Sequence, residues 1–186
     1  GGDGIAQLGH TTVGGGSSGD NRSNEIIKDA SGNTFLVGTT SGSLGEASGG
    51  LSDVIVIKFN AYGKLDTTFG GGKGIVQLGK MTIGDGANSY DYGLSFALDA
   101  SGNILIAGHT SGSLGEASAG STDIFVAKLN ATGALDTSFG GGDGIAQLGN
   151  VTVGVAASGT DYAYSMQLDG SGNIYLGGYT YGDLGE

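Results

Sequence analysis

The sequence has no cysteine and no proline, few basic residues and no long apolar segment. Without cysteine, the chain can form neither a disulfide framework nor a thiolate metal site. Without proline, and without glycine at every third position, it cannot form a collagen helix. Only 7 Lys and Arg residues stand against 18 Asp and Glu, a formal charge of −11. That charge disfavours nucleic acid and anionic lipid as partners, and no apolar run is long enough for membrane insertion.

Glycine is abundant instead, with 42 of 186 residues. Aliphatic and aromatic residues recur between the glycines in short, regular runs, which disordered chains lack. Glycine adopts positive φ without steric cost and is therefore common in tight turns. The composition predicts many short strands connected by turns.

The sequence repeats itself with a fixed spacing. The motif "DASGN" begins at Asp29 and Asp99 and returns as "DGSGN" at Asp169, 70 residues apart each time. The phrase "GIAQLG" or "GIVQLG" keeps the same spacing, at Gly4, Gly74 and Gly144. Such periodicity indicates a repeat architecture. We expect full units at residues 29–98 and 99–168, a partial unit at 169–186, and the end of an earlier repeat, a variable loop and a first strand within residues 1–28. Because the chain opens partway through a motif, we expect it to be a piece of a longer protein.

Each unit contains four segments with strand character. They are "GLSFALD" from Gly93, "ILIAGHT" from Ile104, "DIFVAKL" from Asp123 and "GIAQLG" from Gly144. In the first, Leu94, Phe96 and Leu98 alternate with smaller residues, which is typical of a half-buried strand. The third is almost continuously apolar, which predicts burial on both faces.

Four short antiparallel strands in each repeat predict an all-β fold of β-propeller-like blades. No segment has a 3.6-residue period, so little helix is expected. The period exceeds the roughly 40–50 residues of an ordinary blade, and the surplus lies partly in variable segments at 10–23, 80–93 and 150–163. Fewer than three full repeats cannot close a ring, which predicts an incomplete ring or an open array.

Two motifs carry a family resemblance. "DASGNILIAGHTSGS" followed by "DIFVAKLNATGAL" resembles the bacterial β-propeller repeat called SBBP, and "LDTTFGGGKG" and "LDTSFGGGDG" resemble the related delta-60 repeat. The resemblance covers nearly the whole chain outside the variable segments. It implies blades in a secreted or surface protein of bacteria, and it implies no family-wide catalytic residues.

Metal sites are weaker candidates. Asp29, Ser31 and Asn33, with their equivalents, superficially resemble a calcium loop, but glycine is at the fourth position and no glutamate at the twelfth. Hairpin turns are the favoured interpretation. Glu46 with Asp53, and Glu116 with Asp123, could hold a divalent ion, although solvated acidic loops are the simpler interpretation. We expect no cofactor, with Ca²⁺ as the alternative.

No catalytic motif emerges. His10 and His109 have no histidine partner at a metal-binding spacing, and the chain has no Gly-x-Ser-x-Gly elbow. The glycine triplets at Gly70 and Gly140 lack the Lys-Ser/Thr of a phosphate-binding loop. We therefore expect that the protein is not an enzyme.

Tyrosines are the main candidate binding residues, because an exposed ring offers an apolar face and a hydroxyl. The candidate ligand-binding residues are Tyr90, Tyr92, Tyr162, Tyr179 and Tyr181. Tyr164 aligns with Leu94 and is instead a candidate for the core. Packing in the core or at a sheet edge remains the alternative for the whole group.

The favoured function is an extracellular or cell-surface scaffold, structural or adhesive, whose variable loops bind other molecules. The alternatives are a carbohydrate-binding propeller module, a subunit of an extracellular filament, and a propeller enzyme acting on glycans. Expected partners are other copies of the repeat or chain, and glycans or surface proteins.

Overall fold

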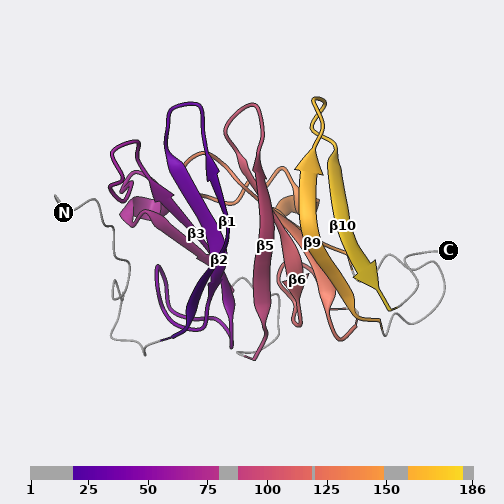
Figure 1. Ribbon diagram of the computed structural model, residues 1–186. Coiled ribbons are helices and arrows are strands. Elements are labelled where there is room, and N and C mark those ends of the chain that lie inside the picture. Colours follow the sequence, from indigo (N-terminus) through magenta and orange to yellow (C-terminus); the bar gives the residue numbers. More distant parts are fainter. Residues whose placement is uncertain (1–18, 80–87, 119, 149–158, 182–186) are drawn as a thin grey trace.

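The computed structural model describes residues 19–79, 88–118, 120–148 and 159–181. Within these ranges, ten strands form three antiparallel sheets (Figure 1). The first sheet contains β1 (Asn21–Lys28), β2 (Thr34–Thr40), β3 (Asp53–Phe59) and β4 (Ile75–Leu78). The second contains β5 (Asp91–Leu98), β6 (Ile104–Thr110), β7 (Asp123–Leu129) and β8 (Ile145–Leu148). The third pairs β9 (Asp161–Leu168) with β10 (Ile174–Thr180). The predicted all-β fold of four-stranded antiparallel units is confirmed, and the described sheets form an open series.

The glycine triplets form short 3-10 turns, η1 (Gly70–Gly72) and η2 (Gly140–Gly142). Gly70, Gly71 and Gly72 all have positive φ, at 60°, 64° and 95°. A side chain would be strained at such angles, so the triplet permits the chain to turn tightly into β4. Among the described residues, no helix has the length and apolar character needed to cross a membrane.

The "DASGN" motif forms the hairpin turn between the first two strands of each sheet. The Asp29 Oδ1 accepts the backbone N–H groups of Ser31 and Asn33 at 2.9 and 2.8 Å. The Asn33 side chain donates to the Asp29 Oδ2 at 2.7 Å. Asp99 and Asp169 repeat these bonds in their own turns. The predicted hairpin turns are present, and their aspartates are held by local hydrogen bonds.

The glutamine of the "GIVQLG" phrase connects β4 to the long loop after β2. The buried Gln77 amide donates to the Gly42 carbonyl at 2.9 Å and to the Asp53 carboxylate at 2.6 Å. Its oxygen accepts the backbone N–H of Leu44 at 2.9 Å. Gln147 makes the equivalent bonds with Gly112, Asp123 and Leu114. In both sheets the glutamine of this phrase thus provides hydrogen-bond partners for buried polar groups of the long loop.

The main core lies between the first and second sheets. The first sheet and its η1 turn contribute Phe35, Val37, Val54, Val56, Phe69 and Leu78, and the second contributes Phe96, Ile104, Ile106, Leu114, Phe125, Ala127, Leu129 and Ile145. A smaller core joins the second and third sheets through Leu105, Ala107, Val126 and Met166. Strands β3 and β7 are buried on both faces, as predicted.

Strands β1, β5 and β9, the first strand of each sheet, run side by side (Figure 1). The Asn24 amide of β1 donates to the Gly93 carbonyl of β5 at 2.8 Å. The Ser95 hydroxyl of β5 accepts the backbone N–H of Met166 in β9 at 3.2 Å. Side chains on the first strand of one sheet therefore lie next to side chains on the first strand of the neighbouring sheet.

A β-bulge alters the pattern predicted for β5. Its pairing with β6 shifts between Gly93 and Ser95. Phe96 is buried as expected, but Leu94 is only half-buried and lies beside a groove. The strict alternation predicted for this strand is therefore wrong at Leu94, because the bulge inserts an extra residue and reverses the facing.

The same bulge occurs in each sheet, opposite Gly38, Gly108 and Gly178. A Cβ at these positions would overlap the backbone oxygens of Arg22, Tyr92 and Tyr162 respectively. Glycine is therefore required for close approach of the first two strands, and the bulge in turn positions the side chains of the candidate site.

Candidate functional site

The predicted tyrosines lie together on the second and third sheets. With His109 and Tyr164 they form a continuous row of rings, here called the aromatic strip: Tyr90, Tyr92, His109, Tyr162, Tyr164, Tyr179 and Tyr181. The period of the repeat explains the row, because Tyr92 pairs with His109 across β5 and β6 and Tyr162 pairs with Tyr179 across β9 and β10.

Two tyrosine pairs within the aromatic strip have parallel rings. The Tyr90 and Tyr92 ring planes differ by 2°, with centroids 6.1 Å apart. Tyr162 and Tyr164 repeat the arrangement, at 4° and 6.0 Å. Residues two apart on a strand point to the same face, which aligns each pair. Each pair offers a flat apolar surface with two hydroxyl groups.

Several of these rings are accessible to solvent. Tyr90 is 46% exposed, Tyr164 50% and Tyr181 79%. The assignment of Tyr164 to the core is therefore wrong, because the bulge in β9 places it beside Tyr162 on the open side of the strand. Exposed aromatic rings gathered in one row are typical of a contact surface.

The aromatic strip also perturbs two titratable groups. A hydrogen bond with Tyr164, together with burial and neighbouring hydroxyls, raises the pKa of Tyr179 to about 12. Burial lowers the pKa of His109 to about 4, so its imidazole is neutral at physiological pH. His109 and Tyr179 are thus both uncharged at neutral pH.

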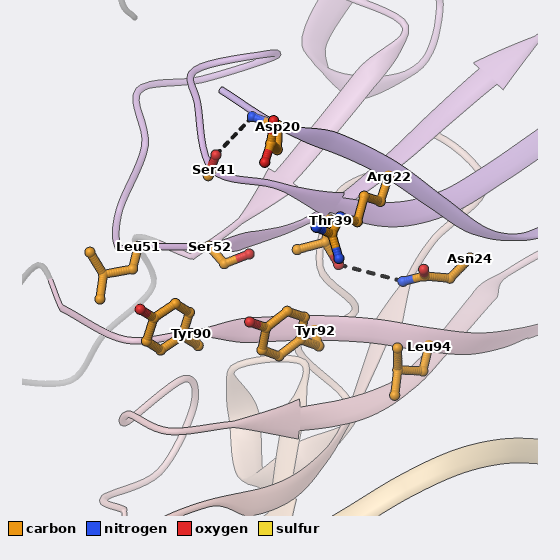
Figure 2. Close-up of a pocket in the computed structure, with 10 residues that line it drawn as sticks. All are labelled: Asp20, Arg22, Asn24, Thr39, Ser41, Leu51, Ser52, Tyr90, Tyr92 and Leu94. Atoms are coloured by element: carbon orange, nitrogen blue, oxygen red, sulfur yellow. Dashed lines mark hydrogen bonds between the residues drawn. The ribbon is translucent and has the colours of Figure 1, made fainter. Parts of the chain in front are cut away.

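A groove of about 310 Å³ lies between the first and second sheets, where the aromatic strip begins. Its walls are Asp20, Arg22, Asn24, Thr39, Ser41, Leu51, Ser52, Tyr90, Tyr92 and Leu94. Figure 2 shows the two tyrosine rings along one wall, with Asp20, Arg22 and Thr39 across from them. One side of the groove is therefore aromatic and the other polar.

Local hydrogen bonds hold the polar wall. The backbone N–H of Asp20 donates to the Ser41 hydroxyl at 2.9 Å. The Asn24 amide is fixed by its bond to the β5 backbone and lies 3.5 Å from the Thr39 hydroxyl. The carboxylate of Asp20 and the guanidinium of Arg22 remain exposed in the groove. This arrangement places planar donors and acceptors beside aromatic faces.

The corresponding place between the second and third sheets is filled differently. One period later, Tyr92 replaces Arg22 and His109 replaces Thr39. The His109 ring meets Tyr162, the equivalent of Tyr92, at 4.4 Å between centroids. Ring atoms thus occupy the space that is open over Tyr92.

A pair of buried carboxyl groups lies near this groove, where the two sheets meet. Asp53 and Asp91 are both almost fully buried. The Asp91 backbone N–H donates to the Ser52 carbonyl at 2.8 Å, which brings the two side chains into one region. Burial, with a smaller effect from the charge of Asp53, raises the pKa of Asp91 to about 7, although a 2.5 Å hydrogen bond from Thr110 opposes the rise.

Two of the acidic residues considered for a divalent ion, Glu46 and Asp53, have different side-chain partners. Asp53 binds the Gln77 amide, whereas the exposed Glu46 faces Lys73 at 3.8 Å. In the described part of the chain, no three His, Cys, Asp or Glu side chains group in a way that could hold a metal ion. His10 and much of the variable segments at 10–23, 80–93 and 150–163 lie outside the described residues.

Two stretches of the chain match known families. Residues 100–139 match a β-propeller domain of unknown function, DUF5122, and residues 143–185 match the SBBP β-propeller repeat. Both matched stretches are thus similar to β-propeller repeats. The resemblance inferred from the sequence is confirmed. No curated protein matches the chain.

Sequence reasoning found the tyrosines of the propeller repeats but missed their polar neighbours. Asp20, Arg22 and Asn24 occur in the copy that differs most from the others, so the repeat pattern gave no signal for them. His109 could have been found from the sequence, because the equivalent residues of the other two copies are a threonine and a tyrosine. Repeat positions whose side chains differ in size between copies are therefore candidates for functional residues.

Proposed function

We propose that these propeller repeats form a non-catalytic binding module of a secreted or cell-surface protein, and that the groove of Tyr90 and Tyr92 binds carbohydrate. This proposal combines the adhesive scaffold with carbohydrate recognition, and moves recognition from the variable loops to the first strands. The observation that carries it is the pair of parallel, accessible tyrosine rings facing polar side chains.

The chemistry of the groove suits a sugar. The C–H faces of a pyranose ring pack on aromatic side chains, and its hydroxyls both donate and accept hydrogen bonds. Asp20 can accept from hydroxyls, while Arg22 can donate to ring and hydroxyl oxygens. A volume of about 310 Å³ is at the lower end of ligand pockets and suits one or two sugar rings.

The scaffold supports this use. The tyrosines stand on strands anchored by two hydrophobic cores, so little conformational entropy is lost when they bind. A tyrosine ring has only two rotatable side-chain bonds, which keeps that cost small. Repeated along an adhesive protein, such grooves would gain avidity from weak individual contacts.

A glycan array tests the proposal. The protein is applied beside a Tyr90→Ala/Tyr92→Ala variant and a Tyr62→Ala control, whose ring is 90% exposed on the turn after β3. We expect binding to a restricted set of glycans, retained by the control and reduced at least tenfold in the double variant. A hit that survives loss of both groove tyrosines, or an array with no hit, would count against carbohydrate binding in this groove.

A further inference from the structure

We propose that the groove between β1 and β5 recognises a hexuronate, a sugar ring that carries a carboxylate, and that Arg22 is the counter-ion for that carboxylate. The inference rests on the proposed carbohydrate-binding function and specifies its ligand class. It depends on Arg22, on Asp20, and on the residues that differ between the junction of the first and second sheets and the junction of the second and third.

Arg22 is an exposed cation in a strongly acidic chain. It is one of only 7 basic residues in a protein of net charge −11. Its guanidinium makes no ion pair or hydrogen bond with the residues that the structure describes, unlike Lys58 and Lys128, which pair with Asp66 and Asp136. A guanidinium facing a groove presents a planar fork of donors that matches a carboxylate.

Asp20 supplies the second constraint. Asp20 and Arg22 are two residues apart where β1 begins, which separates them by about 7 Å along the strand. A hexuronate carries its carboxylate at one side of the ring and hydroxyls at the opposite side. With the carboxylate at Arg22, the far hydroxyls lie toward Asp20, which accepts hydrogen bonds from them. The opposite orientation would place two carboxylates together and is disfavoured.

The tyrosine wall completes the match. Tyr90 and Tyr92 lie across the groove from these two side chains (Figure 2). A sugar bound between the walls would pack a C–H face on the rings while its edge meets Arg22 and Asp20. The two hydroxyls of the tyrosines remain available for hydrogen bonds to the next sugar along a chain.

The second pair of sheets provides an internal comparison. There the equivalents of Asp20 and Arg22 are Tyr90 and Tyr92, and the equivalent of Thr39 is His109. The two tyrosines supply no cation, and the neutral imidazole of His109 fills the space. The positive charge therefore belongs to the first groove, and of its two tyrosines only Tyr92 has a tyrosine as its equivalent, Tyr162.

The test compares one polymer with its own ester. Polygalacturonate and fully methyl-esterified polygalacturonate share the same sugar and linkage, and only the first carries free carboxylates. Binding of each to the protein is measured by titration at low and high salt, beside a panel of neutral oligosaccharides. We expect the free acid to bind at least tenfold more tightly than the ester, and the difference to shrink with salt.

Arg22→Gln should remove that preference, because it should lower the affinity for the free acid much more than the affinity for the ester. Arg22→Lys should keep part of it, because the charge remains but the planar fork is lost. Lys64→Gln, which removes an equal charge from an exposed turn, should change neither affinity. The melting temperature of each variant shows that the fold is retained.

Equal binding of acid and ester, tighter binding of the ester, or a preference that survives Arg22→Gln would overturn the hexuronate assignment. If the neutral oligosaccharides bind while both polymers do not, the carbohydrate function stands and the hexuronate inference fails. If none of the saccharides binds, both proposals fail.

Discussion

The imidazole of His109 meets the ring of Tyr162 edge-on, with centroids 4.4 Å apart and planes at 73°. At the equivalent position of the first sheet, Thr39 leaves the face of Tyr92 open to a groove. The two positions share their strand pairing and bulge, but His109 replaces Thr39 and Tyr92 replaces Arg22. The space beside the tyrosine ring is thus open in the first case and filled by the imidazole in the second.

Replacing His109 with threonine should open the second position. With the imidazole gone, Tyr162 and Tyr164 would form a platform like that of Tyr90 and Tyr92. We expect a neutral saccharide that binds the wild type at one equivalent to gain a second, weaker site in His109→Thr, as measured by calorimetric titration. The reverse change, Thr39→His, should abolish the first site. An unchanged stoichiometry in His109→Thr would contradict this role of the imidazole.

The buried carboxyl of Asp91 should make stability depend on pH. Its pKa is raised from 3.8 to about 7, so the folded protein keeps a proton that the unfolded chain has already released. The contribution of Asp91 to the free energy of unfolding is therefore largest below about pH 4 and falls as pH rises to about 7, by about 4 kcal/mol at most.

Asp91→Asn should remove this fall, because asparagine is neutral throughout and Asn21 already accepts the same threonine bond in the first sheet, at 2.6 Å from Thr40. The lowered pKa of His109 gives a slope of opposite sign, but both proteins share it and it cancels in the difference. Chemical denaturation across pH 4–8 provides the measurement. Parallel curves for wild type and variant would show that Asp91 does not carry the effect.

Gly108→Ala should destabilise the second sheet. A Cβ there would overlap the backbone oxygen of Tyr92, which cannot move without disturbing the bulge. We expect a loss of about 1–3 kcal/mol in the free energy of unfolding. Gly170→Ala is the matched control, because nothing lies within 4 Å of the Cβ it would add. A Gly108→Ala protein as stable as the control would mean that the close approach at the bulge is not required.

Removal of divalent cations should leave the protein's stability unchanged. The Asp29 carboxylate already accepts three hydrogen bonds within its own turn, and Asp99 and Asp169 repeat them. We expect equal melting temperatures in EDTA and in millimolar CaCl₂. A rise of several degrees in CaCl₂ would show that an ion binds and stabilises the folded state.

The sequence predicts most of the architecture, because the same physical constraints recur at each period. The Asp29 turn, the apolar third strands and the four-strand unit follow directly from local chemistry and alternation. The bulge escapes such reasoning, because it depends on the pairing of two strands. Simple alternation consequently predicts the wrong face of the strand for Leu94 and Tyr164.

The tyrosines of the site could be predicted from residue type and the repeat, but not the row that they form. That row needs β5 and β9 to lie side by side, which only packing of whole sheets determines. Arg22 and Asp20 had no signal at all, since they differ from their repeat equivalents without any pattern that points to a ligand. Charged residues that line a groove can be recognised only once the structure shows which segments form its two walls.

Tyrosine ring resonances measured by NMR test the central claim most directly. The protein is labelled with ¹³C-tyrosine, its signals are assigned by single Tyr→Phe variants, and the strongest saccharide from the glycan array is added in steps. The groove model predicts saturable shifts for Tyr90 and Tyr92, and none for Tyr62 on its distant turn. Saturable binding that leaves the signals of Tyr90 and Tyr92 unchanged would contradict it.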